Sequence, residues 1–267
     1  MVYMMRTASL PFKQAFSLVE LSIVLVILGL LVGGVLSGQS LIRAAELRSI
    51  SSDYSRYIAA SQSFRDKYFA LPGDMTNATA FWQEAHATPA TCRTTVGTGT
   101  ATCNGNGNGT IASFSLGVDE HFRAWQHLAN AGLIEGTYTG VTGAAHASED
   151  ANPAVNVPRG RISNSGFGFN PVGSVTNAAD TNYFVGNYGN AMHFGGNGAA
   201  NMYYPLIKPE EQWNLDTKMD DGLPHQGFVR SFKTASTLTP GCAAASNIAY
   251  DLVATGNLCS IVFTTGF

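Results

Sequence analysis

A long uncharged stretch near the N-terminus constrains this chain more than any other feature of its sequence. No charged residue occurs between Leu21 and Ile42, and a helix of about 20 apolar residues is long enough to cross a bilayer. The sequence therefore predicts a membrane-spanning helix. Glu20 lies at the edge of this stretch. An unpaired carboxylate at the centre of a membrane helix costs about 2.5–3.5 kcal/mol on insertion scales, so Glu20 requires a partner or a purpose.

Three interpretations of this stretch compete. A cleaved secretory signal has a short apolar core followed by a small-residue cleavage site, whereas this core is longer and continues into a charged helical pattern. A plain membrane anchor explains the length, and the positive-inside tendency explains the basic Arg6 and Lys13. It leaves the cost of Glu20 unexplained. The third interpretation is a specialised anchor in which the acid has a role.

The residues around Glu20 resemble a known signal. The stretch "AFSLVELSIVLVILGLL" is similar to the class III signal of type IV pilins and type II secretion pseudopilins. In that signal a short basic leader and a small residue precede Phe, and Glu follows at the fifth mature position. The resemblance implies that a prepilin peptidase cleaves between Ala15 and Phe16 and methylates the new amino group of Phe16. The family usually has Gly where this chain has Ala15, and both residues are small.

The resemblance also implies partners and a role for Glu20. In assembled filaments of this family the acid neutralises the terminal amine of a neighbouring subunit, and charges that are costly singly in lipid offset each other when paired. The partners implied are the prepilin peptidase, other pilin or pseudopilin subunits and the inner membrane. The chain would cross that membrane once, with its head in the periplasm, or outside the cell in an assembled filament.

Helical periodicity continues beyond the apolar stretch. Apolar and aromatic residues recur there at intervals of three and four, with arginines largely between them. This pattern predicts one helix from Phe16 to about Tyr68, ended by Pro72 and Gly73, with half in the membrane and half packed on a globular head. The periodic residues are Leu41, Ala45, Ile50, Tyr54, Tyr57, Ile58, Ser61, Phe64 and Tyr68.

We therefore expect three regions. Residues 1–15 form a leader, residues 16–72 form the long helix, of which 16–38 span the membrane, and residues 73–267 form the head. Glycines within the membrane segment have two GxxxG spacings, which suit close helix packing in lipid. At about 1 kcal/mol per glycine they could equally loosen the helix, and the sequence favours neither interpretation. These glycines are Gly29, Gly33, Gly34 and Gly38.

Four cysteines favour an extracytoplasmic head. They form no CxxC motif and have no His at zinc-ligand spacing, which argues against a zinc site. Disulfides are the better interpretation and agree with export. Three pairings are open from sequence alone, and we favour the two local ones because each closes a short polar loop. The local pairs are Cys92 with Cys103 and Cys242 with Cys259.

The head is predicted to be α+β, with short helices and an antiparallel sheet, so that the whole chain has a pilin-like fold class. Asp74 would cap a short helix, "VDEHFRAWQHLANAGLIEG" reads as a second helix that stops at Gly132, and "KPEEQWNLDTKM" has Pro209 in a first helical turn. The stretch from Cys92 to Thr110, which contains "NGNGNG", has no periodicity and is predicted to be a mobile loop. Short strands are expected in "TNYFVGN", "NMYYPLI", "GFVRSF", "NIAYDLV" and "CSIVFTT".

Motifs for catalysis or nucleic-acid binding are absent from the sequence. It contains no GxSxG, HExxH or Walker-type motif, so we expect a non-enzymatic protein without a required cofactor. The net charge of −3 and the lack of a basic patch give no reason to infer nucleic-acid binding. His121 and His127 are six residues apart and should lie on different faces of a helix, one half-buried and one exposed.

One group of acids could hold a metal ion. Asp216, Asp220 and Asp221 precede Gly222, and such an acidic turn could bind Ca²⁺ together with backbone carbonyls and water. Major pseudopilins have a calcium loop in their C-terminal region, although this spacing differs from an EF-hand and Lys218 interrupts the charge. The favoured alternative is that Asp216 and Asp220 face water on one side of a helix, with Asp221 in the following turn.

The sequence thus predicts a structural filament subunit. Because the head is larger than the head of a typical major pilin, the resemblance favours a minor pilin or pseudopilin. The alternative is a single-pass, membrane-tethered extracytoplasmic binding domain that does not polymerise. The sequence does not distinguish a pilus from a secretion system or a DNA-uptake apparatus.

Overall fold

The computed structural model describes residues 17–92, 94–112, 120–142, 151–197, 201–233, 241–244, 246 and 248–267. The contacts divide the chain into an N-terminal unit, Met1–Ala45, and a second unit, Glu46–Phe267. From here on, "head" means this second unit, which is larger than the range 73–267 expected from the sequence. The division falls inside the first helix rather than at residue 73, because the last part of that helix packs into the head.

Helix α1 (Leu18–Tyr68) crosses this division and ends where the sequence predicts. The stop is made by Phe69, ahead of Pro72 and Gly73. Phe69 adopts a left-handed backbone with φ 55°, and its N–H donates to the Arg65 carbonyl at 2.8 Å. This is the αL form of helix end, in which glycine is the usual residue.

The part of α1 that belongs to the head is amphipathic. Tyr54 stacks on Phe263 with ring centroids 4.2 Å apart, and Tyr57 meets Trp125 edge-on at 5.0 Å. Five of the periodic residues are buried, which confirms the predicted stripe over this part of the helix. The buried residues of α1 are Ile50, Tyr54, Tyr57, Ala60, Ser61 and Phe64.

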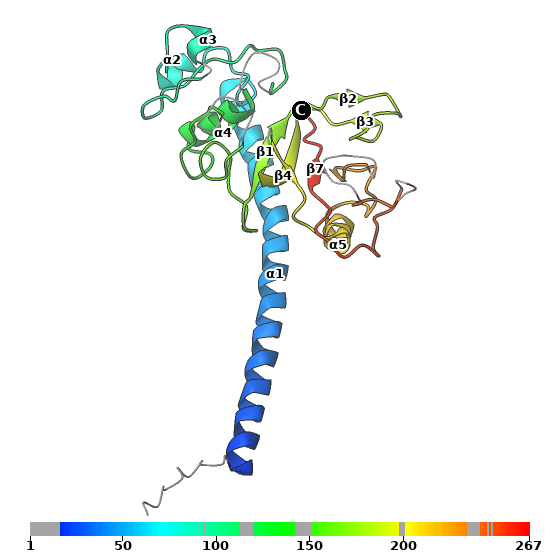
Figure 1. The fold of residues 1–267 in the computed structure, drawn as a ribbon. Helices are drawn as coiled ribbons and strands as arrows, with labels where there is room; N and C mark the ends of the chain where they lie inside the picture. Colours follow the sequence, from blue (N-terminus) through cyan, green and yellow to red (C-terminus); the bar gives the residue numbers. More distant parts are fainter. Residues whose placement is uncertain are drawn as a thin grey trace, which may run out of the picture. The chain divides into compact units, whose positions relative to one another are not determined.

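An antiparallel sheet forms the other side of this core, as predicted (Figure 1). Its order is β1-β4-β7-β6, with β5 also paired to β4, and β2 pairs with β3 in a separate ribbon. The strands are β1 (Ser165–Asn170), β2 (Ser174–Val175), β3 (Gly186–Asn187), β4 (Ala191–Asn197), β5 (Met202–Tyr204), β6 (Val229–Arg230) and β7 (Ile261–Phe263).

Both faces of the sheet are covered. Along β4, Met192 and Phe194 belong to the main core, whereas Ala191 packs in a second cluster with Val262 of β7. Successive residues of a strand point to opposite faces, so this alternation follows from the pleat. The two longest strands, β1 and β4, were missed from sequence. They are short in β-branched residues and rich in glycine. The predicted strand "NIAYDLV" is wrong over its described residues, 248–253, where the sheet pairing is a single isolated bridge between Ala243 and Tyr250.

Four short helices complete the described part of the head. Two of them, α4 and α5, confirm the sequence predictions, and Gly132 after α4 has the left-handed φ of 71° that a stop requires. Asp74 does not cap α2, whose N-cap position is Ala78 without a side-chain bond. The helices are α2 (Thr79–Trp82), α3 (Pro89–Cys92), α4 (Glu120–Asn130) and α5 (Pro209–Met219).

Both local disulfides are present. Cys92 pairs with Cys103 and Cys242 pairs with Cys259, which confirms the favoured connectivity. The first links α3 to the start of the Asn-Gly loop. The second ties the segment before Tyr250 to the approach to β7, so both crosslinks lie within the head.

Candidate assembly signal and acidic sites

The N-terminal part of α1 is apolar and exposed. Its large apolar side chains from Leu18 to Leu36 are all at least half exposed, and Leu30 is 73% exposed. Among the described residues, α1 is the helix that is long and apolar enough to cross a membrane. The helix continues unbroken past Gly29 and Gly38, and a Cβ at any of the four GxxxG glycines would meet no neighbour within 4 Å. Both interpretations of these glycines stay open.

Glu20 has a local partner at the start of this helix. Its Oε2 accepts the Ser17 N–H at 2.9 Å, while the Ser17 hydroxyl oxygen accepts the Val19 N–H at 3.2 Å. These two bonds form a variant of the capping box, in which Glu20 at N3 bonds the N-cap N–H but the Ser17 hydroxyl bonds the N–H of N2 rather than that of N3. Sequence reasoning missed it, although the spacing Ser-x-x-Glu carries the signal.

Residues 11–36 match the family model of the prokaryotic N-terminal methylation motif. The chain carries a prepilin-type signal. The matched range includes Ala15, Phe16 and Glu20, so the family resemblance is confirmed over this segment. No curated protein and no solved structure matches the chain.

The signal supports a type IV pilin-like or pseudopilin protein that a prepilin peptidase processes. With the apolar helix, it indicates anchoring in a membrane. Ala15 and Phe16 lie outside the described residues, so cleavage and methylation have no structural description and stay predictions. The α+β architecture, a long N-terminal helix with an antiparallel sheet and short helices, is pilin-like.

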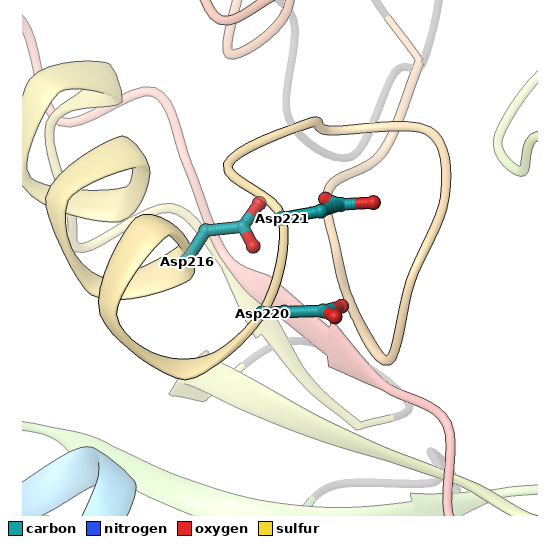
Figure 2. Close-up of side chains that lie close together, drawn as sticks. All are labelled: Asp216, Asp220 and Asp221. Carbon is teal, nitrogen blue, oxygen red and sulfur yellow. The ribbon is translucent and has the colours of Figure 1, made fainter.

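The three acids near the end of α5 lie together (Figure 2). One ligand oxygen from each of Asp216, Asp220 and Asp221 comes within 4.8 Å of the others. The expectation that Asp216 faces water is wrong, because this side chain is fully buried. Its Oδ2 accepts the Tyr250 hydroxyl at 2.7 Å, and its Oδ1 accepts the Gly222 N–H at 3.1 Å.

The other two carboxylates also receive backbone donors. Asp220 accepts the N–H groups of Phe228 and Val229, and Asp221 accepts the Leu223 N–H at 2.9 Å. Oxygen ligands suit Ca²⁺, but both oxygens of Asp216 are already engaged, so the arrangement fits a role in holding the loop after α5 better than a ready ion site. Calcium binding stays a prediction. Burial, reinforced by the neighbouring acids, raises the pKa of Asp216 to about 7.

A separate pair of acids, Asp74 and Glu120, organises the "NGNGNG" loop. Asp74 accepts the N–H groups of Asn108 and Gly109 at 3.0 and 2.8 Å. Glu120, at the start of α4, accepts those of Asn106 and Ala112 at 2.8 and 2.9 Å. The predicted mobile loop is therefore bonded along its length. No local sequence pattern predicts these hydrogen bonds, because the two acids lie outside the loop. Burial raises the pKa of Glu120 to about 7.

The two histidines of α4 are both buried, so the expectation of one exposed histidine is wrong. Almost every residue of α4 is buried, because the helix is covered on more than one side. The Nδ1 of His127 accepts the Gly73 N–H at 3.0 Å, and its Nε2 lies 3.0 Å from the Thr102 hydroxyl. Burial lowers the pKa of His121 to about 4 and that of His127 to about 3. Both are neutral structural residues.

A groove lies in the head, beside the end of α1. It has a volume of about 830 Å³, and its lining includes Phe69, Asp74 and Gly109. Phe69 is 93% exposed, and the lining also includes Arg65 and Asp66, which carry opposite charges. A lining with both signs of charge selects no particular class of ligand.

Proposed function

We propose that this protein is a non-enzymatic structural subunit of a type IV pilus or type II secretion-like filament. A prepilin peptidase cuts the chain between Ala15 and Phe16 and methylates Phe16. The mature subunit is held in the inner membrane by residues 16–38, with its head in the periplasm, and enters a fibre through its N-terminal helix. The match of residues 11–36 to the N-terminal methylation motif carries this proposal.

The exposed helix surface supports assembly through α1. The side chains from Leu18 to Leu36 are apolar on every face of the helix, including Leu25 and Val26 at 62% exposure each. Burial of apolar surface contributes about 25 cal/mol per Å², so this surface requires apolar surroundings all round. Lipid supplies them before assembly, and neighbouring N-terminal helices supply them in a fibre.

Glu20 could act in two ways, as a helix cap or as the partner of a positive charge, and the two differ in whether they require its negative charge. In the capping box, a neutral Gln serves nearly as well as Glu, since the side-chain oxygen is the acceptor in both. Pairing with the positive terminal amine of a neighbour requires the negative charge. We propose that pairing is the main role, because a cap alone does not repay the cost of an ionised group next to lipid.

Within this class the protein is a minor pilin or pseudopilin, which primes or tips a fibre. The support is the size of the region after residue 72 and its two disulfides. The alternative, a membrane-tethered binding domain that never polymerises, has the 830 Å³ groove in its favour. It gives no reason for a methylation motif around Phe16.

The first test is the N-terminus of the mature chain. Protein recovered from the membranes of cells that make a prepilin peptidase should begin at Phe16 and carry a methyl group on its amine. The measurement is mass spectrometry of the N-terminal peptide, with peptidase-deficient cells as the control. A chain that keeps residues 1–15 in peptidase-positive cells contradicts the proposal.

The second test uses two substitutions of Glu20. Glu20→Gln keeps the capping oxygen but removes the charge, and Glu20→Ala removes both. Breaking one side of a buried charge pair costs about 3–5 kcal/mol, so both variants should be lost from sheared filaments while their membrane levels stay normal. If only Glu20→Ala is defective, the role of Glu20 is capping. If both enter filaments like wild type, the pairing role is wrong.

A further inference from the structure

Three Asn-Gly dipeptides follow one another in the loop between Cys103 and Ile111, at Asn104, Asn106 and Asn108. An asparagine before glycine can cyclise, because the peptide nitrogen of the glycine can attack the side-chain carbonyl carbon. Glycine lacks a Cβ, so nothing shields that nitrogen. All three asparagines are exposed to solvent, so water can reach each of them. The dipeptides therefore share one intrinsic reactivity and differ only in what surrounds them.

The hydrogen-bond acceptors of the three glycine nitrogens differ. The Gly105 N–H donates to the Met75 carbonyl at 2.8 Å, and the Gly107 N–H donates to the backbone carbonyl of Asp74 at 3.0 Å. A peptide carbonyl is a very weak base and cannot take the proton. The Gly109 N–H instead donates to the carboxylate Oδ2 of Asp74 at 2.8 Å, within the reach that general-base catalysis requires.

The side-chain carbonyl oxygen of Asn108 also differs from those of Asn104 and Asn106 in its hydrogen bonds. Its Oδ1 accepts two bonds from Thr110, one from the N–H at 2.9 Å and one from the hydroxyl at 2.6 Å. Donors aimed at an oxygen that gains negative charge in the reaction stabilise the transition state. At the other two dipeptides, Oδ1 accepts a single backbone N–H, from Thr79 for Asn104 and from Asn108 for Asn106.

We propose that Asn108 is a site of self-catalysed deamidation, with Asp74 as the general base and Thr110 as the oxyanion donor. Asp74 takes the proton of the Gly109 N–H, and the nitrogen forms a bond to Cγ of Asn108. The bond from Cγ to Nδ2 breaks, and Nδ2 leaves as ammonia with the proton from Asp74. Water then opens the cyclic imide at either carbonyl and leaves an aspartyl or isoaspartyl residue at position 108.

The product changes the electrostatics of the loop. A new carboxylate at position 108 stands close to Asp74, which accepts the N–H of the same residue at 3.0 Å. Glu120 holds the neighbouring Asn106 at 2.8 Å. Like charges at such separations repel, so modification weakens the bonds that hold this wall of the 830 Å³ groove. The step converts a closed loop into a looser one as the folded protein ages.

The chain supplies its own controls for a test. Purified full-length protein in detergent is incubated near neutral pH, both folded and in urea, and the fraction modified at each asparagine is followed by peptide mass spectrometry with fragment ions. In the folded chain Asn108 should react about 100-fold faster than Asn104 and Asn106, the low end of what a positioned base supplies. In urea the three rates should converge, because the local sequences are nearly the same.

Two substitutions separate catalysis from loop mobility. Thr110→Val removes the hydroxyl but keeps the backbone N–H, and should slow the reaction at Asn108 about tenfold, less than for a main oxyanion donor. Thr110→Ser keeps the hydroxyl and should restore the rate. Asp74→Asn should bring the rate at Asn108 to that of Asn104 and Asn106. Thermal unfolding of each variant, followed by tryptophan fluorescence, checks that the head is intact.

Two results would contradict the proposal. If Asn108 in the folded chain reacts no faster than the other two, or slower than in urea, the bonds protect the loop and the proposal is wrong. It is also wrong if Thr110→Val, with unchanged unfolding, leaves the rate at Asn108 unaltered.

Discussion

The two parts of helix α1 share a backbone conformation and differ in what their side chains contact. From Leu18 to Leu36 the large apolar side chains are at least half exposed, whereas Tyr57 and Phe64 in the later part are 3% and 0% exposed. The first part is apolar on every face. The second part is apolar on one face only, and that face packs against the sheet and α4. Helical periodicity therefore indicates a protein core only where polar residues occupy the other faces.

The comparison predicts different consequences for the same kind of mutation. Loss of an apolar side chain matters in the later part because a packed core leaves a cavity behind. In the first part the same loss removes only surface that lipid or neighbouring helices would cover. Three experiments test this difference, and they run from the largest expected effect to the smallest.

Phe64→Ala should have the largest effect on the head. Phe64 is fully buried among Tyr68, Trp82 and His127, and truncation of a buried Phe costs about 3–5 kcal/mol. All three tryptophans, Trp82, Trp125 and Trp213, follow Glu46 in the chain, so their fluorescence during urea unfolding reports on the head. Leu28→Ala is the matched control and should not change the unfolding. An equal effect of both substitutions would contradict the comparison.

Leu28→Lys should have the next largest effect, on the membrane rather than on the head. A lysine at the centre of a membrane helix costs about 2.5–3.5 kcal/mol on insertion scales, so this variant should be released from membranes by an alkaline wash that leaves wild type bound. Ser52→Lys places the same charge on an exposed position of the later part and should stay bound. Retention of Leu28→Lys would contradict the placement of residue 28 near the centre of the membrane.

The third experiment varies pH and should change only the head. Burial raises the pKa of Glu120 from 4.5 to about 7 and that of Asp216 from 3.8 to about 7. The folded state therefore binds these protons more tightly than the unfolded state. The stabilisation is fully present below about pH 4 and is lost as the pH rises to about 7.

Between pH 5 and pH 6 each acid should lower the free energy of unfolding by about 1 kcal/mol. The buried His121 and His127, whose pKa values are lowered to about 4 and about 3, act in the opposite direction, because the unfolded state binds more protons at these sites. Glu120→Gln isolates one acid: the free energy of unfolding of the wild type minus that of the variant should fall by about 1 kcal/mol from pH 5 to pH 6. Binding to membranes should not change over the same range, since no charged residue lies between Leu21 and Ile42. A difference in the free energy of unfolding between the two proteins that stays constant from pH 5 to pH 6 would show that Glu120 has no raised pKa in the folded head.

The sequence predicted the features that depend on local patterns. The periodic stripe on α1, helices α4 and α5, the two disulfides and the prepilin-type signal all follow from spacing or composition within short segments. The presence of an antiparallel sheet was predicted, but not all of its strands. Its longest strands were missed because each contains two glycines, which have low β propensity; in β1 these glycines alternate with Phe167 and Phe169. Burial of these two rings in the core stabilises the strand, and the β propensity of single residues does not include this tertiary contribution.

The acids of the head could not be predicted for a related reason. The bonds of Asp74 to residues 108 and 109, and of Asp216 to Tyr250, join positions 34 or 35 residues apart. Spacing near each acid predicted a helix cap and a water-facing turn, and the tertiary structure uses both acids to hold loops instead. At Glu20 the sequence strongly indicated the prepilin-type signal. The local capping interaction with Ser17 was missed, although its spacing is also visible in the sequence.

The place of β7 in the sheet has a consequence for the order of events in the cell. β7 follows every other strand in the chain but lies between β4 and β6, and Asn190 bonds to Thr265 and Phe267 on the segment after it. Such non-local pairings form late and slowly. The sheet cannot close until the ribosome has made Ile261–Phe263, by which time the apolar segment has long been synthesised. While the chain is being made, the apolar segment can therefore enter the membrane before the sheet of the head has closed.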